Sequence, residues 1–249
     1  MEYKKYPRTY HLNFSEGVQS DDKVIESLDC LENEEIVALL KYDGENTTGY
    51  SNGYSHARSI DSKTNWTRDI VKKIFSVISH DIPEGYRLCC ENLYAKHSIY
   101  YPDNYLEGYL YLLSIWDEKN ECLSYDDTLE YAELFDLPTP KELYRGPFDL
   151  KILKNLGRNL DTSIEEGFVV RVTRKFHYDE FSKCVTKYVR EGHVQTNEHW
   201  LKNAVPNGTL KQPCKPAFLS HLNQISMYVE LDKTLDNSDE KAEQKKLKV

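Results

Sequence analysis

The chain is 249 residues long, and its 41 Asp and Glu residues outnumber its 32 Lys and Arg residues, which leaves a formal net charge of −9. Proteins that coat nucleic acid non-specifically carry a basic excess that neutralises phosphates, so this charge argues against that class. Hydrophobic residues make up 39% and charged residues 29% of the chain, and this composition argues against a disordered or fibrous protein.

The beginning of the chain, Met-Glu-Tyr-Lys-Lys-Tyr, lacks the apolar segment of a secretory signal. No stretch approaches the roughly 18–20 consecutive apolar residues that a membrane-spanning helix needs. We therefore expect no membrane partner and a location in the cytoplasm.

Hydrophobic patterning predicts strands through most of the chain and helices at three places. The first strand, Ile36–Leu40, precedes an Asp-Gly turn and a predicted returning strand, Thr47–Tyr50. Helices are predicted at Asp69–Ser79, Asp126–Phe135 and Ala217–Leu231, where apolar residues recur at helical spacing. The other predicted strands are Tyr86–Cys90, Tyr109–Trp116, Gly167–Val172 and Val185–Val189.

Charge is distributed unevenly along the chain. From Asp21 to Glu35 there are seven acidic residues and one lysine, and acidic residues are again dense from Asp117 to Asp136. Arg171 to Arg190 instead holds six basic residues and two acidic ones, and Arg58 to Lys73 holds five basic residues. The acidic segments are typical of solvated surfaces, whereas the two basic segments could together form a surface for phosphates.

Lys41 opens the most informative stretch, Lys-Tyr-Asp-Gly-Glu-Asn, directly after the predicted strand Ile36–Leu40. A lysine at the end of a buried strand can act as a nucleophile when burial or a nearby positive charge lowers its pKa. Gly44 lets the backbone come close to a ligand. The alternative interpretation is a simple hairpin with an exposed lysine, and the short motif alone does not decide between the two.

Three further segments follow this stretch in a definite order. Glu-Asn-Leu-Tyr begins at Glu91, Glu-Gly-Phe-Val-Val-Arg begins at Glu166, and a predicted strand carries Lys187. In this order and spacing, the four segments resemble motifs I, III, IV and V of the covalent nucleotidyltransferases, which include ATP-dependent ligases and capping enzymes.

Longer strings narrow the resemblance to an RNA ligase family of phages and bacteria. Three of them are Tyr-Pro-Arg-Thr-Tyr-His-Leu from Tyr6, His-Ala-Arg-Ser from His56 and Ala-Lys-His-Ser-Ile-Tyr from Ala95. Two more follow the fourth motif, His-Val-Gln-Thr from His193 and His-Trp from His199. The resemblance covers about residues 6–205.

The resemblance implies an ATP-dependent RNA ligase that works in three steps. Lys41 would attack the α-phosphate of ATP to give a lysyl-AMP, AMP would pass to an RNA 5′-phosphate, and an RNA 3′-OH would displace AMP. Lys187 would lower the pKa of Lys41 and hold the α-phosphate. Glu166 would bind Mg²⁺, or Mn²⁺ in its place, because hard oxygen ligands suit such ions. Glu91 would contact the ribose hydroxyls.

Other residues are candidate contacts by the same resemblance. Asp43 and Gly44 belong to the motif around Lys41 and are expected at the nucleotide. Asn46 and Arg58 match positions that touch AMP or the RNA 5′-phosphate in related ligases, and Arg58 offers the fork geometry that phosphate favours. Lys96 is a further candidate phosphate contact.

Two positions depart from the family pattern. Motif V has two lysines one residue apart, whereas this chain has Lys187 and, on the opposite face of the predicted strand, Arg190. We expect Lys187 in the pocket and keep Arg190 as a candidate second phosphate contact. The aromatic residue that stacks on adenine in relatives falls within Tyr111–Trp116, where Trp116 or Leu113 could fill that role or occupy the core instead.

These features predict an α+β fold in which two antiparallel sheets with flanking helices enclose the nucleotide. Residues 1–205 would form the nucleotidyltransferase domain, and residues 206–249 a short helical element and a polar tail. The segment after Arg190 is short for the five-stranded OB barrel that DNA ligases and capping enzymes usually append, so no OB domain is expected.

The alternatives are a DNA ligase, a GTP-dependent capping enzyme and a non-catalytic RNA-binding relative. The short C-terminal segment argues against the first two, and the presence of both Lys41 and Glu166 argues against the third. The expected partners are ATP, RNA with 5′-phosphate and 3′-OH ends, and an end-healing kinase or phosphatase. The expected location is the cytosol of a bacterium or of a phage-infected host.

Overall fold

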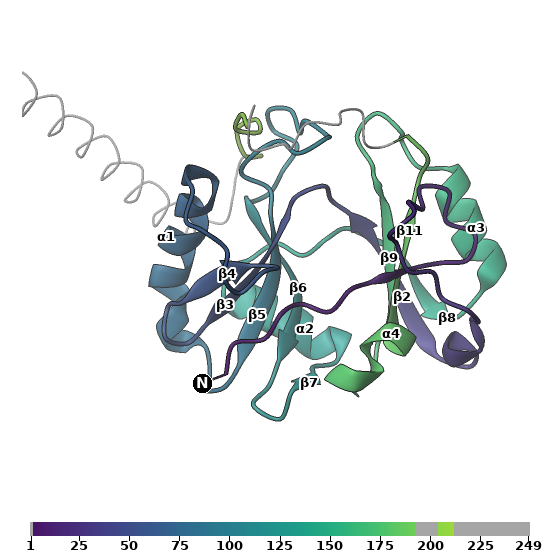
Figure 1. Cartoon of the computed structure of the whole chain (residues 1–249), viewed down its shortest axis with the longest axis horizontal. Coiled ribbons are helices and arrows are strands. Elements are labelled where there is room, and N and C mark those ends of the chain that lie inside the picture. Colours follow the sequence, from purple (N-terminus) through teal and green to yellow (C-terminus); the bar gives the residue numbers. More distant parts are fainter. Residues whose placement is uncertain (1, 193–203, 212–249) are drawn as a thin grey trace, which may run out of the picture. The chain divides into compact units, whose positions relative to one another are not determined.

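The computed structural model describes residues 2–192 and 204–211, and Figure 1 shows two β-sheets with helices on their outer sides. The compact unit of the chain ends at Lys211 and so includes residues beyond the predicted domain boundary at 205. Residues 206–208 belong to it because the Asn207 amide and the Gly208 N–H bond the backbone of Leu93 and Tyr101. The predicted helix Ala217–Leu231 lies outside the described residues, as do His193 and His199.

Sheet A pairs its strands antiparallel except at one edge, where β1 runs parallel to β11. Helix α3, Leu150–Arg158, packs against its outer face, with Leu153 buried against Phe168 and Val170. The Asp149 carboxylate caps this helix by accepting from two of its first N–H groups. The strand order is β1 (Tyr10–His11), β11 (Val185–Val189), β9 (Gly167–Val172), β2 (Glu35–Lys41) and β8 (Glu142–Pro147).

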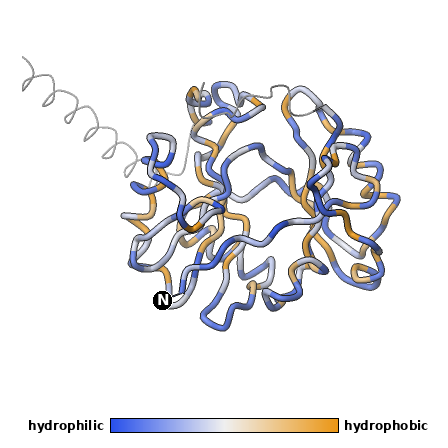
Figure 2. The backbone as a smooth tube through the Cα atoms, viewed as in Figure 1, coloured by the Kyte–Doolittle hydropathy of each residue, from blue (hydrophilic) through white to orange (hydrophobic). Residues whose placement is uncertain are grey.

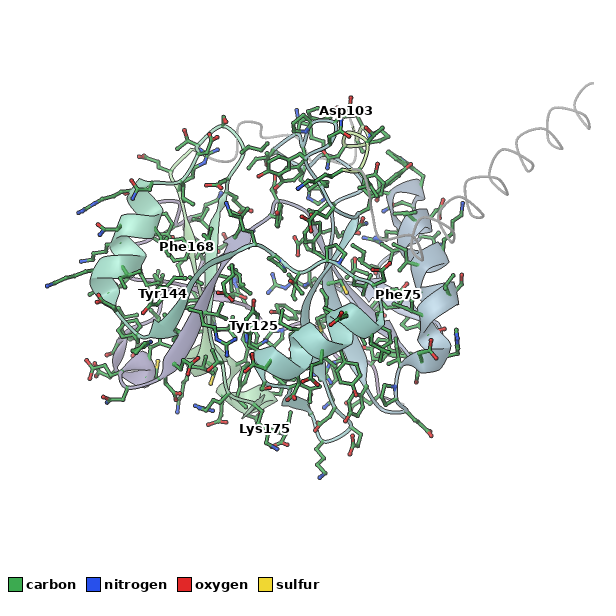
Figure 3. The ribbon with its side chains drawn as sticks, turned by 180° about the vertical axis from the view of Figure 1, so that it is seen from behind. Phe75, Asp103, Tyr125, Tyr144, Phe168 and Lys175 are labelled. Atoms are coloured by element: carbon green, nitrogen blue, oxygen red, sulfur yellow. The ribbon has the colours of Figure 1, made fainter. Side chains whose placement is uncertain are left out.

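Sheet B is antiparallel throughout. Helix α1, Asp69–Ile78, covers its outer face, and the Phe75 ring packs so closely on Gly49 of β3 that a Cβ there would lie 2.1 Å from it. Phe75 and Phe168 mark the two outer packing layers in Figure 3. The strand order is β10 (Phe176–His177), β7 (Glu121–Cys122), β6 (Leu110–Trp116), β5 (Arg87–Asn92), β3 (Glu45–Tyr50) and β4 (Ser55–Ala57).

The remaining helices are short or lie beneath the sheets. Helix α2, Tyr125–Leu134, begins with Ser124 as its cap and buries Tyr125 against Val37 and Leu39 of sheet A. The others are α4 (Phe181–Cys184) and the 3₁₀ turns Asp29–Leu31, Trp66–Arg68, Ser79–Asp81 and Tyr178–Glu180.

Strand alternation determines which side chains face the space between the sheets. On β9, Phe168 and Val170 point outward into the core under α3, and Val169 and Arg171 point inward. On β2 the inward side chains include Leu39 and Lys41. Figure 2 shows hydrophobic residues gathered in the sheets and in the helix faces that pack on them, with hydrophilic residues along the outer loops.

The expected α+β fold with two sheets is confirmed, and the predicted strands and the first two predicted helices are present within one or two residues. The predicted return of the chain after Asp43-Gly44 is wrong in its pairing. β2 pairs with β8 and β9, whereas β3 pairs with β4 and β5 in the other sheet. The short connection therefore crosses between the sheets instead of closing a hairpin.

Helices long and apolar enough to cross a membrane are absent from the described part of the chain. Sequence patterning missed the short strands β1, β4, β7 and β10, the strand β8, and the helices α3 and α4. For β8 the reason is that Glu142–Pro147 contains an exposed glutamate, an arginine and a glycine and has little apolar alternation.

Candidate functional site

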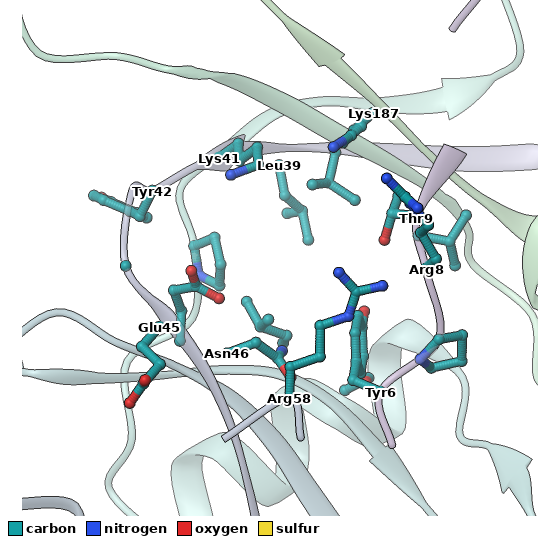
Figure 4. Close-up of a pocket in the computed structure, with 18 of the residues that line it drawn as sticks. Tyr6, Arg8, Thr9, Leu39, Lys41, Tyr42, Glu45, Asn46, Arg58 and Lys187 are labelled. Carbon is teal, nitrogen blue, oxygen red and sulfur yellow. The ribbon is translucent and has the colours of Figure 1, made fainter. Parts of the chain in front are cut away.

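A cavity of about 570 Å³ lies between the two sheets. Both sheets line it, together with an N-terminal segment that contributes Tyr6, Pro7, Arg8 and Thr9. Figure 4 shows Lys41 and Lys187 pointing into the cavity from sheet A and Arg58 pointing in from the opposite side. The structure therefore gathers residues that are far apart in the sequence around one partly open cavity.

Lys41 ends β2, and its Nζ lies 2.5 Å from Glu166 Oε2, just before β9. Burial by itself would lower the pKa of Lys41, but the carboxylates of Glu166, Glu91 and Asp43 outweigh it and hold this pKa above its ordinary value. The lysine is thus a protonated ammonium in the free protein. A neutral amine, which nucleophilic attack requires, would form at Lys41 only if these carboxylates were engaged elsewhere.

Glu91 lies on β5 directly across from Asn46 on β3. Burial, reinforced by the charges of Glu166 and Asp43 against the opposing charge of Lys41, raises the pKa of Glu91 to about 8. Its carboxyl is therefore largely protonated at neutral pH and can donate a hydrogen bond. The Asn46 Oδ1 is buried without a hydrogen-bond partner, although its Nδ2 donates to Cys90 O at 3.4 Å.

Lys187 projects from β11 toward the same end of the cavity. Its Nζ lies 3.7 Å from Asp22 Oδ1, and His11 Nε2 lies 3.1 Å from the other oxygen of that carboxylate. Burial lowers the pKa of Lys187, and the charge of Lys41 acts in the same direction while that of Asp22 opposes it. Lys187 therefore loses its proton more easily here than a lysine in water does.

Arg171 lines the opposite end of the cavity. On sheet A it pairs with Val37, whereas Lys41 pairs with Gly167, so the two ends are about 13 Å apart along the strand at a rise of roughly 3.3 Å per residue. The Arg171 side chain is 3% exposed, its Nη2 donates to Leu123 O at 2.8 Å, and its Nη1 has no partner.

The surroundings of Arg171 are aromatic rather than acidic. Its guanidinium lies 5.9 Å from the centre of the Tyr125 ring and 5.8 Å from that of Phe176. Within the described residues no carboxylate forms an ion pair with it. A buried cation with an unpaired donor calls for a hydrogen-bond acceptor in the cavity.

The comparisons with known proteins agree with this geometry. The family model described as RNA ligase matches residues 34–189, which hold Lys41, Glu91, Glu166 and Lys187. The chain belongs to the RNA ligase family.

Solved structures with a similar fold include two forms of an archaeal ATP-dependent RNA ligase. One has a TM-score of 0.52, 14% identity, and coverage of 75% of this chain and 48% of its own. The other has a TM-score of 0.51, 11% identity, and coverage of 76% and 48%. A Naegleria gruberi RNA ligase mutant with ATP and Mn has a TM-score of 0.48, 13% identity, and coverage of 76% and 58%.

This RNA ligase family member spans about half the length of the solved structures that it matches. No similar sequence was found among proteins of curated function. The likeness to the archaeal structures therefore supports the fold, and the family model supports the membership.

Several predicted site residues of this RNA ligase family member lie elsewhere. Trp116 and Leu113 were both candidates to stack on adenine or to occupy the core; Trp116 is fully buried, with its ring against Phe176 and Arg87, whereas Leu113 lines the cavity. Its strand, β6, is buried on both faces, so alternation alone could not distinguish the core from the cavity. Trp116 therefore occupies the core, which was one of the alternatives for it.

Arg190 and Lys96 also lie outside the cavity lining. The Arg190 guanidinium donates to the backbone oxygens of Glu165 and Glu191, which agrees with its place on the opposite strand face. The Lys96 backbone N–H bonds Val205 O, and it is the next residue, His97, that lines the cavity. Neither residue is therefore part of the cavity wall.

Asp43 and Gly44 shape the crossing between the sheets. Asp43 Oδ2 accepts from the Ser98 and Ile99 N–H groups at 2.6 and 2.7 Å, so the carboxylate holds one loop against another. A Cβ at Gly44 would lie 2.6 Å from Asn92 O, which means that glycine is needed for close packing against β5. Both residues place Lys41, and only Gly44 also lines the cavity.

Sequence reasoning missed three features of the cavity wall. Arg68 forms a two-pronged ion pair with Glu45, with Nε 2.6 Å from Oε2. Arg171 was recognised only as part of a basic stretch, and its isolation was invisible because contacts between strands cannot be read from spacing. Tyr6 supplies an aromatic ring to the cavity, and its only signal was the string around it.

Groups of three or more metal-binding side chains are absent from the residues that the structure describes. Glu166 is 4% exposed and bound to Lys41, and Glu91 faces the cavity. One or two carboxylates fit Mg²⁺ or Mn²⁺ held mainly by substrate phosphates and water, but they do not fit a metal bound by protein alone.

Proposed function

We propose that this chain is an ATP-dependent RNA ligase that joins a 5′-phosphate to a 3′-OH through a covalent Lys41-AMP. The observation that carries the proposal is the placement of Lys41 at the edge of a partly open cavity, between Glu166 and Lys187, in a chain of the RNA ligase family. The geometry supplies a nucleophile, a phosphate-binding cation and a space of nucleotide size.

In the first step the neutral Lys41 Nζ attacks the α-phosphate of ATP. The new N–P bond forms as the bond from the α-phosphorus to the bridging oxygen breaks, pyrophosphate leaves with that electron pair, and the amine proton passes to water. Lys187 stabilises the charge on the α-phosphate oxygens. A divalent ion with Glu166 among its ligands would neutralise phosphate charge.

The carboxylate of Glu166 has two roles in this proposal. In the free protein it holds Lys41 protonated, and a divalent cation that takes over this carboxylate removes the largest charge that raises the pKa of Lys41. Binding of the metal and ATP would therefore release the amine for attack. Lys187 then adds the positive neighbour that favours the neutral form.

The base and ribose would lie along β9 toward Arg171. The unpaired Nη1 of Arg171 would donate to a ring nitrogen of adenine, and the protonated Glu91 carboxyl would donate to a ribose hydroxyl. Leu113 and Val169 supply apolar surface for the base. Arg58, exposed on the opposite wall, would hold the RNA 5′-phosphate in the later steps.

The decisive experiment is covalent labelling. Protein incubated with Mg²⁺ and α-labelled ATP should acquire label, Lys41→Ala should abolish it, and Lys175→Ala, which removes an exposed lysine outside the cavity, should retain it. Label retained in Lys41→Ala would refute the assignment of the nucleophile. Preferential labelling by α-labelled GTP would favour a capping-type enzyme.

The nucleic acid is tested on the same preparation. RNA strands with 5′-phosphate and 3′-OH ends should be joined, and DNA strands of the same sequence should be joined much more slowly. Equal or faster joining of DNA would make the chain a DNA ligase with the same adenylylation chemistry. A labelled protein that joins neither strand would show that the family's sealing steps are missing.

A further inference from the structure

Residues 3–10 form a strap that runs from sheet B to sheet A, as the N-terminal trace in Figure 1 shows, and residues 6–9 of this strap line the cavity. At the sheet B end, the Lys4 N–H donates to Tyr50 Oη at 3.0 Å and Tyr178 Oη donates to Lys5 O at 2.9 Å. At the sheet A end, Tyr10 enters β1 and pairs with β11. The strap is thus held at both ends, with its middle over the cavity.

Arg8 is the cation that the strap brings to the cavity. Its Nη2 lies 3.0 Å from Asp21 Oδ2 and 3.6 Å from Asp22 Oδ1. The same Asp22 oxygen lies 3.7 Å from Lys187 Nζ. One carboxylate oxygen therefore bridges Arg8 and Lys187 in the free protein.

A phosphate oxygen can make the same bridge. Figure 4 shows Lys41, Lys187 and Arg8 following one another along one wall of the cavity. The positive charges of both Lys41 and Arg8 lower the pKa of Lys187, so all three cations act on the same part of the cavity. A chain of phosphates that begins at Lys41 and Lys187 would run toward the guanidinium of Arg8, whose fork geometry suits phosphate oxygens.

The direction of the reaction fits this arrangement. On the proposed function, Lys41 attacks the α-phosphorus on the side opposite the departing pyrophosphate, so the β- and γ-phosphates must point away from Lys41. Arg8 lies beyond Lys187 in that direction. It also lies outside residues 34–189, so the family match does not assign it a role.

We propose that Arg8 binds the β- and γ-phosphates of ATP and then the pyrophosphate leaving group, replacing its contacts with Asp21 and Asp22. This inference rests on the proposed function and adds a subsite to it. Asp21 and Asp22 hold the Arg8 guanidinium in position and balance its charge before the nucleotide binds. Arg8 acts in adenylylation only, because the later steps contain no pyrophosphate.

The test separates the adenylylation step from sealing. Arg8→Ala should raise the ATP concentration for half-maximal adenylylation by about tenfold or more, the effect expected for a lost charge-assisted hydrogen bond. It should raise by a similar factor the pyrophosphate concentration needed to convert preformed protein-AMP back to ATP. Sealing of RNA that already carries a 5′-AMP should change less than about twofold, because it bypasses pyrophosphate.

Two further variants make the result specific. Arg174→Ala removes an exposed arginine that pairs with Glu34 outside the cavity, and it should leave all three measurements unchanged. Asp22→Asn removes the competing charge and should lower the pyrophosphate concentration for half-maximal reversal. It thereby tests the subsite even if Arg8→Ala folds poorly.

Three outcomes would overturn the inference. They are an unchanged dependence on ATP and pyrophosphate in Arg8→Ala, an equal loss in sealing of preadenylylated RNA, and weaker pyrophosphate reversal in Asp22→Asn. If the wild-type protein forms no adduct at all, the proposed function itself fails, and that result is visible before any variant is compared.

Discussion

The two ends of the cavity balance their positive charges in different ways. At the Lys41 end each cation has a carboxylate partner, Glu166 for Lys41 and Asp22 for Lys187. At the Arg171 end the guanidinium bonds backbone oxygens and the Cys122 side chain, lies between aromatic rings and has no carboxylate partner among the described residues. The first end can exchange carboxylates for phosphates, which are also anions, whereas the second lacks only a neutral acceptor such as a purine nitrogen.

The largest expected effect comes from removing a carboxylate at the Lys41 end. Glu166→Ala should slow adenylylation by about 100-fold or more, because it removes the partner that positions Lys41 and the proposed ligand of the divalent ion. Quench-flow measurement of adduct formation over a range of Mg²⁺ concentrations checks this. A rate near that of the wild type would mean that Glu166 only neutralises Lys41.

Substitution at the Arg171 end should separate binding from stability. Arg171→Met keeps most of the apolar stem but removes the donor, so half-maximal adenylylation should require about tenfold more ATP. The midpoint of thermal unfolding should not fall, because an unpaired buried charge is also removed. Calorimetry and ATP titration check both parts, and a large loss of stability with unchanged ATP dependence would contradict the assignment.

Substitution of Arg58 tests whether the cavity wall that carries it acts in a later step of the reaction than the Lys41 and Arg171 ends do. Arg58→Ala should leave adenylylation within about twofold of the wild type and slow joining of 5′-phosphate RNA to a 3′-OH by about tenfold. Single-turnover joining with preformed protein-AMP measures the second effect. Loss of the adduct in this variant would instead place Arg58 at the ATP phosphates.

An effect on stability instead of activity is the pH dependence that arises from Glu91. Its pKa is about 8 in the folded protein and roughly 4.3 in an unfolded chain, so between these values the folded state binds more protons. The unfolding free energy should therefore fall as pH rises toward 8 and level off above it. Glu91→Gln should flatten this slope in denaturant titrations between pH 6 and 9, and an unchanged slope would assign it to other groups.

The sequence predicted the central strands of both sheets, because their apolar runs are long and bounded by polar turns; these are β2, β9 and β11 in one sheet and β3, β5 and β6 in the other. It did not predict that β2 and β3 belong to different sheets, since patterning identifies a strand but not its partner. The motif order identified Lys41, Glu91, Glu166 and Lys187, and the structure brings them to one place. The sequence did not predict that the pKa of Lys41 is raised, because this shift depends on carboxylates from three separate segments.

The residue of β6 that would contact the base could not be identified from the sequence either. Trp116 and Leu113 were equal candidates for contact with the base, because β6 is apolar on both faces and spacing cannot tell one buried face from the other. Only the ladder with β5, which shifts register between Cys89 and Cys90, determines which residues of β6 face inward. A bulge of this kind leaves no clear trace in the amino-acid pattern.

The strap and the Lys41–Gly44 connection both cross between the sheets, and both are tied down on each side. They are two of several covalent connections between the sheets, because the β7–β8, β9–β10 and β10–β11 connections also pass from one sheet to the other. Substitutions of side chains that line the cavity should lower the affinity for a nucleotide without changing the distance between the sheets, because these backbone connections remain. Cleavage of the backbone within the strap would remove one of these connections while leaving every lining side chain outside the strap intact.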